Sequence, residues 1–238
     1  MNGELRALSL AHGLLLGLLL ASPLFATAIL PHAVSALFLL GGFQLRLADR
    51  RWDMRSGARA WISHVRMAPR RLLPWGAAAL VAMIGGDGAR AEAIVAAALL
   101  CELLVYPIGA HLLARLARPW VALVLALLIA LGPRAASETM ALILAFVTGI
   151  AACLVWLRGP DGDGRSLALM LGGGAAAALM PLLAPATTPY AFPTAATCIT
   201  LALAHLSVLR RRPLPWRADG GAGRRIRRPL WPLPSRLS

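Results

Sequence analysis

Glu102 is the residue whose position most needs a chemical explanation. It interrupts an apolar run from Glu92 to Arg115 and has no charged neighbour along the chain. In a helix rising ~1.5 Å per residue it lies ~15 Å from Glu92, near the midplane of a bilayer ~30 Å thick. An ionisable group there is costly, so we expect it to face the bundle interior and either to have a partner or to stay protonated. It is either a protonated, functional carboxyl or a structural acid that hydrogen-bonds to a backbone carbonyl or a threonine. Tyr106 lies one turn further on the same face, and we predict that the two act together.

The last apolar run has one polar face. At ~100° per residue, Thr194, Cys198 and His205 project within about 40° of one another, and Thr197 lies beside them. We expect this polar stripe to line a path through the bundle together with Glu102.

Three histidines are candidate ligands for a metal or haem. His12, His111 and His205 each fall a few residues inside the predicted cytoplasmic end of an apolar run. Equal depth would let their imidazoles meet around one ion. The alternative is three separate interfacial histidines, because no HxxxH or HxxE spacing places two ligands on one helix. The sequence leaves the metal and any cofactor undetermined.

Asp49 and Asp53 are candidates for contact with phosphate or a metal ion. Carboxylates suit magnesium, and the arginines around them suit a phosphate group. This pattern keeps open an intramembrane enzyme that acts on lipid or isoprenoid phosphates at the cytoplasmic interface. The chain has no lysine, which excludes a lysine Schiff base and a Walker A nucleotide site. It also has no GxSxG nucleophile motif, so an enzyme is the less favoured class.

Composition indicates the class of protein that must position these groups. The 238 residues are 59% hydrophobic and 14% charged, whereas soluble domains are ~45 to 50% apolar. The sequence therefore predicts an all-α, polytopic helical membrane bundle over residues 1–209. The net charge of +14 would suggest nucleic acid in a soluble protein, but here we expect the lipid bilayer as the partner and no nucleic acid.

About eight transmembrane helices are predicted. Residues 7–45 are too long for one span and form a hairpin, and six further runs cover residues 72–86, 92–113, 119–132, 140–156, 167–185 and 191–209. Residues 1–28 imitate a cleavable signal peptide, but a retained first helix is the better interpretation because more spans follow at once. When the loops between successive spans are assigned to alternating sides of the membrane, every arginine except Arg90 and Arg134 falls on one side. This predicts a multi-pass inner-membrane protein with both termini cytoplasmic.

Two basic segments lie outside the predicted spans. The loop 46–71 is arginine-rich, and the tail 210–238 is rich in proline and arginine. We expect the loop to lie on the anionic leaflet and the tail to be disordered, so that both contact anionic lipid headgroups. They would also serve as docking surfaces for membrane-protein partners.

Three functions are compatible with the sequence. A permease or transport component for a small solute or lipid-like substrate is favoured, because Glu102 provides a protonatable intramembrane group. A membrane-embedded assembly or scaffold factor is an alternative, which needs only small-residue helix faces and basic surfaces. The intramembrane enzyme is the third possibility. The substrate, any partner and the oligomeric state are not determined by the sequence.

Overall fold

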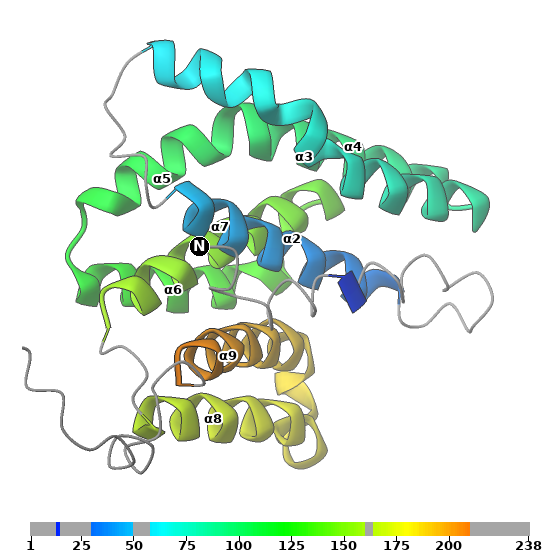
Figure 1. The fold of residues 1–238 in the computed structure, drawn as a ribbon. Helices are drawn as coiled ribbons and strands as arrows, with labels where there is room; N and C mark the ends of the chain where they lie inside the picture. Colours follow the sequence, from blue (N-terminus) through cyan, green and yellow to red (C-terminus); the bar gives the residue numbers. More distant parts are fainter. Residues whose placement is uncertain (1–12, 15–29, 50–57, 160–163, 210–238) are drawn as a thin grey trace, which may run out of the picture.

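The computed structural model describes residues 13–14, 30–49, 58–159 and 164–209, and within these ranges the chain forms helices and no strand (Figure 1). The elements, in chain order, are α2 (Leu30–Ala48), α3 (Ala58–Ile84), α4 (Gly88–Leu100), η4 (Cys101–Val105), α5 (Tyr106–Arg115), α6 (Arg118–Leu131), η5 (Gly132–Arg134), α7 (Glu138–Leu157), α8 (Gly164–Leu183), η6 (Pro185–Thr187) and α9 (Thr188–Leu209).

Helix α7 lies at the centre of the bundle. Every residue from Thr148 to Leu154 is buried, which is the pattern of a helix surrounded on all sides. Helices α2, α4, α6 and α9 all pack against it. Figure 1 shows the α3–α4 hairpin along one side of the α2–α7 pair and the α8–α9 hairpin along the other.

Helices α2 and α7 meet backbone to backbone at two glycines. A Cβ atom added to Gly42 would overlap the carbonyl of Phe146, and one added to Gly149 would overlap the carbonyl of Leu39. Small residues allow helices to approach this closely. Helix α3 is joined to the same region by Trp75, whose ring contacts that of Phe38 with 4.2 Å between centroids and 33° between planes.

Local sequence signals define the helix ends around the centre. Asp87 caps α4, because its carboxylate accepts a hydrogen bond from the N–H of Arg90 at 3.0 Å. Ser137 caps α7 in the same way, accepting from the N–H of Met140 at 3.2 Å. Gly86, with φ of 79°, provides the left-handed residue that the tight turn from α3 to α4 requires. Next to these caps, Arg90 Nε of α4 donates to Glu138 Oε1 of α7 at 2.7 Å and joins the two helix starts.

Four segments are long and apolar enough to cross a membrane, namely Gly88–Arg115, Glu138–Leu157, Gly164–Leu183 and Pro185–Val208. The chain is therefore all-helical and has the character of a membrane protein, but the prediction of about eight spans is not confirmed. The apolar part of α2, His32–Ala48, is shorter than these four, and α6 has only 14 residues. Helix α3 carries several arginines in its first half. The first predicted span lies almost entirely outside the described residues.

The prediction of a polar loop over residues 46–71 is wrong at its start, where α2 runs to Ala48, and again from Ala58 onward. Helix α3 begins there and runs to Ile84 without interruption. The residues on its contacting face repeat at alternating intervals of three and four, so this face follows the neighbouring α4 and η4. These positions are Trp61, His64, Ala68, Arg71, Trp75, Ala78 and Ala82. Residues 50–57 and the tail 210–238 lie outside the described residues.

Candidate functional site

Glu102 lies in a π-helical turn, η4, between α4 and α5. Pro107 accounts for this turn, because proline has no N–H to bond with the carbonyl of Leu103 four residues earlier. The N–H of Tyr106 bonds to the carbonyl of Cys101, five residues back, rather than to that of Glu102. The carbonyls of Glu102 and Leu103 are therefore left for partners outside their own helix.

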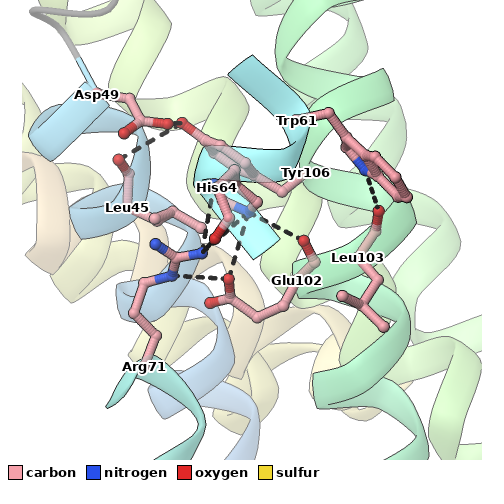
Figure 2. A network of polar contacts seen from close by, with 8 residues as sticks. All are labelled: Leu45, Asp49, Trp61, His64, Arg71, Glu102, Leu103 and Tyr106. Carbon is pink, nitrogen blue, oxygen red and sulfur yellow. Dashed lines mark hydrogen bonds and ion pairs between the residues drawn. The ribbon is translucent and has the colours of Figure 1, made fainter. Parts of the chain in front are cut away.

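Helix α3 supplies both partners (Figure 2). The indole Nε1 of Trp61 donates to the carbonyl of Leu103 at 3.1 Å, and Nε2 of His64 lies 3.0 Å from the carbonyl of Glu102. Buried carbonyl groups that lose their helical donor are costly unless another donor reaches them. These two bonds thus fix α3 against the π-helical turn, and they explain why Trp61 and His64 are three residues apart.

The carboxylate of Glu102 is paired with Arg71. Arg71 Nε donates to Glu102 Oε2 at 2.8 Å, and the two side chains are 27% and 4% exposed. Arg71 Nη2 also donates to the carbonyl of His64 at 2.8 Å. Glu102 therefore has a cationic partner on α3, and the prediction that its carboxyl is protonated stays a prediction.

His64 contacts both Arg71 and Glu102. Arg71 Nη2 lies 3.3 Å from Nδ1 and 3.1 Å from Nε2 of the imidazole. Nε2 also lies 3.0 Å from the carbonyl of Glu102, to which it donates in the tautomer that carries its proton on Nε2.

Tyr106 extends the site to α2. Its buried hydroxyl donates to the carboxylate of Asp49, which lies just beyond the end of α2. The Tyr106 ring stacks on the ring of His64 with 5.1 Å between centroids and 16° between planes. A continuous set of contacts therefore joins Asp49, Tyr106, His64, Arg71 and Glu102 (Figure 2). We call these five residues the polar network; they come from three separate stretches of sequence.

A pocket of about 260 Å³ lies beside the polar network. Arg71 and Glu102 form part of its wall, and Trp75 and Phe146 add aromatic surface. The rest of the lining comes from Gly41, Gln44, Leu45, Ala48 and Pro74. Its volume is close to the lower limit of ~300 Å³ for small-molecule pockets. A half-buried guanidinium and a buried carboxylate in one wall can hold a solute that carries a charged group.

The structure brings together Glu102, Tyr106 and Asp49 among the residues that the sequence analysis selects. The carboxylate of Asp49 accepts a hydrogen bond from the Tyr106 hydroxyl. Asp53 lies outside the described residues. The expected polar stripe on α9 does not line the same pocket as Glu102. The hydroxyls of Thr194 and Thr197 donate to carbonyls of their own helix at 2.7 Å. The stripe therefore does not belong to the Glu102 pocket, and a longer path that joins the two stays a prediction.

The other stripe residues pack inside the bundle. Cys198 faces Gly173 and Gly174 of α8, and His205 is buried edge-on to Trp156, 6.5 Å between centroids. His111 is half-buried on α5, and His12 lies outside the described residues. Within the described ranges, no group of three His, Cys, Asp or Glu side chains is placed to hold a metal ion. The predicted three-histidine cluster thus stays a prediction.

Sequence analysis missed Trp61, His64 and Arg71, because their arginine-rich surroundings suggest a loop. The spacing of three and then seven residues along one helix face would identify them. Pro107 is the matching signal on the other side, since a proline within an apolar run frees carbonyl groups that need outside donors.

No protein-family model matches the chain, and no curated protein or solved structure matches it. The fold and the site together describe a helical protein with membrane-spanning character and with an ion pair in the wall of a pocket.

Proposed function

We propose that this protein is a permease or transport component that binds a small solute through an anionic group at Arg71. One observation carries the proposal: the Arg71–Glu102 ion pair forms part of a pocket wall instead of lying in a closed core. Guanidinium groups recognise carboxylates and phosphates through paired hydrogen bonds. A solute anion that enters the pocket therefore competes with Glu102 for the same cation.

Competition at Arg71 would couple solute binding to a proton. When the solute takes Arg71, the carboxylate of Glu102 loses its main partner in a buried place. It can bind a proton or turn to Nε2 of His64, which lies 3.5 Å from Oε2. Carboxylate and histidine groups arranged in this way form the proton relays of membrane pumps and transporters. This coupling supports a transport role for the site.

Substitution of Glu102 tests the proposal. Glu102→Gln keeps the shape and a hydrogen-bond acceptor for Arg71 but cannot titrate. We expect normal membrane accumulation with solute-driven proton uptake reduced about tenfold or more, because the amide cannot take up the proton that the carboxylate would bind when the solute displaces it from Arg71. The measurement is proton uptake into proteoliposomes with an entrapped pH-sensitive dye, screened against monocarboxylates, dicarboxylates and amino acids.

The matched control for this test is Thr194→Val, which removes a hydroxyl that lies outside the pocket. It should retain the parent's uptake. Full activity of Glu102→Gln across pH would eliminate the titrating role. Uptake by the parent no faster than that of empty liposomes, for every compound class, would contradict transport itself.

The proposed arrangement in the membrane has eight spans and cytoplasmic termini. It adds α2, α3, α6 and the segment before Leu30 to the four apolar segments, and it is supported by the arginine distribution. Reporter fusions after Arg55, Arg165 and Arg217 should be cytoplasmic, and fusions after Gly88 and Ala135 periplasmic. A periplasmic signal at Arg165 would refute this arrangement.

The proposed partners are anionic lipid headgroups at the basic cytoplasmic surfaces. The arginines near residues 46–71 and in the tail 210–238 support this, since each basic side chain near an anionic leaflet contributes ~1 kcal/mol. Arg66 of α3 is exposed and available for such a contact.

An assembly or scaffold factor is the second candidate function. One observation favours it: only 6% of the apolar segment Gly164–Leu183 is buried within the bundle. Helix α8 packs against α9 along one face, and its remaining faces are open to lipid or to another membrane protein. Copurification distinguishes the two functions, because a discrete partner complex supports assembly and solute movement by the protein alone supports transport.

A further inference from the structure

The wall of the Arg71–Glu102 pocket holds one charge of each sign. Of the residues that line the pocket, only Arg71 and Glu102 are charged, and Gln44 adds a neutral amide. The two charged side chains point toward one another (Figure 2), with 2.8 Å between Arg71 Nε and Glu102 Oε2. With Glu102 ionised, the wall is neutral as a whole, and a ligand that enters the pocket meets both charges.

The titratable groups behind this wall are His64, Tyr106 and Asp49. Nε2 of His64 lies 3.5 Å from Glu102 Oε2. Further along the polar network, the carboxylate of Asp49 accepts a hydrogen bond from the Tyr106 hydroxyl, and the guanidinium of Arg46 interacts electrostatically with the same hydroxyl. That end of the network therefore also combines one acid with one arginine. Histidine side chains are ordinarily uncharged at about pH 8, which is the condition chosen for the test below.

A ligand with a single charge upsets the balance of the pocket. An anion at Arg71 brings a second negative charge next to Glu102, whose side chain is 4% exposed. A buried charge without a partner is strongly unfavourable, so this complex needs a proton on Glu102. A cation at Glu102 leaves Arg71 without its anion in the same way.

A zwitterion avoids both costs. Its anionic group bonds to the guanidinium of Arg71 and its ammonium group bonds to the carboxylate of Glu102, so each member of the ion pair exchanges one charged partner for another. The pocket stays neutral without a proton. The two protein charges are in direct contact, so the two charges of the ligand must also lie close together. The carboxylate and the ammonium group on one α-carbon meet this requirement.

The rest of the pocket suits a small apolar side chain. Trp75 and Phe146 contribute aromatic surface, and Leu45 and Pro74 contribute aliphatic surface. The Trp75 ring is itself packed on Phe38, with 4.2 Å between centroids. The volume of about 260 Å³ restricts the ligand to a small molecule.

We propose that the ligand of this pocket is a small zwitterion, namely an α-amino acid with an apolar side chain. Its carboxylate binds Arg71, its ammonium group binds Glu102, and its side chain packs against Trp75 and Phe146. The inference rests on the proposed anion contact at Arg71 and adds the second charge that the ligand carries. The amino acid binds without a proton, whereas a simple anion of the same shape needs one.

Competition binding to the purified full-length protein in lipid nanodiscs tests this ligand class. The probe is radiolabelled leucine. The competitors are unlabelled leucine, isocaproate, which is leucine without its ammonium group, and isoamylamine, which is leucine without its carboxylate. At about pH 8 we expect leucine to compete at a concentration about tenfold or more below that of either analogue. Each analogue leaves one member of the ion pair without a charged partner.

Glu102→Gln should invert the order of the ligands. Without the carboxylate, an anion alone balances Arg71, and the ammonium group of leucine has no charged partner. With radiolabelled isocaproate as the probe, we expect leucine to bind about tenfold or more weakly than it binds the parent and isocaproate to become the stronger competitor. Thr194→Val, which lies outside the pocket, is the matched control and should keep the parent's order.

The parent protein alone also decides the inference, should Glu102→Gln fail to accumulate. Equal competition by leucine and isocaproate overturns the inference and leaves the anion contact at Arg71 in place. Stronger competition by isocaproate, the order expected for a protonated Glu102, overturns it, as does the absence of saturable leucine binding. Selective leucine binding without leucine uptake into proteoliposomes would uphold the ligand class and contradict transport.

Discussion

Arg71→Leu is expected to destabilise the folded bundle by about 3 to 5 kcal/mol. The change removes the cation from Glu102 but leaves its carboxylate 4% exposed in the protein interior. It also removes the guanidinium that bonds the carbonyl of His64 at 2.8 Å. The measurement is thermal unfolding of the detergent-solubilised protein, followed by the fraction that stays monodisperse after heating.

The double variant Arg71→Leu, Glu102→Leu separates the ion pair from simple loss of packing. Replacing both members of a buried pair by apolar groups is often neutral, so the double variant should recover most of the lost stability. Arg66→Leu is the matched control, because Arg66 lies on the same helix with an exposed side chain. The interpretation of the site is wrong if Arg71→Leu is no less stable than Arg66→Leu.

Composition was sufficient to predict the class of fold and the inward position of Glu102. A chain this apolar has few alternatives to helices, because unpaired backbone groups are too costly in lipid. A lone acid within an apolar run must face the protein, and Glu102 is indeed buried. These predictions depend on solvation energies, which act at each position irrespective of the tertiary structure.

The partners of Glu102 could not be found by the same reasoning. Arginine is costly in a membrane interior only when it is unpaired, so charge alone assigned Arg71 to a loop. In the structure its charge is compensated by Glu102, 31 positions away along the chain. Pairing between distant residues is a property of the tertiary structure. The regular spacing of inward positions on α3 was the available local signal.

The π-helical turn is a second feature that depends on two distant segments, α3 and the chain from η4 to α5. Pro107 in the sequence indicates that carbonyl groups will lose their donors, but not which side chains will replace them. Trp61 and His64 of α3 replace them, and they lie 42 and 38 residues before the carbonyl groups that they contact. The predicted number of spans is not confirmed, because α2, α3 and α6 are each too short or too polar to be identified as spans by length and composition.

Gly149→Ala is expected to separate α2 from α7 and to cost about 1 to 3 kcal/mol or more, the usual penalty for overfilling a packed interior. The added Cβ would overlap the carbonyl of Leu39 and lie 2.9 Å from the N atom of Phe43. Backbone atoms inside a helix cannot move aside individually, so the whole helix must shift. Gly42→Ala should have a similar effect, because its Cβ would overlap the carbonyl of Phe146.

Three further substitutions make this a graded test. At Gly41 the added Cβ would meet only the ring of Trp75, at 2.7 Å from its nearest atom, and a side chain can rotate. At Gly76 and Gly172 it would meet nothing within 4 Å. We therefore expect the melting temperature to fall most for Gly149→Ala and Gly42→Ala, less for Gly41→Ala, and not at all for Gly76→Ala or Gly172→Ala, where alanine favours the helix. Equal effects at Gly149 and Gly172 would show that the close crossing of α2 and α7 does not hold the bundle together.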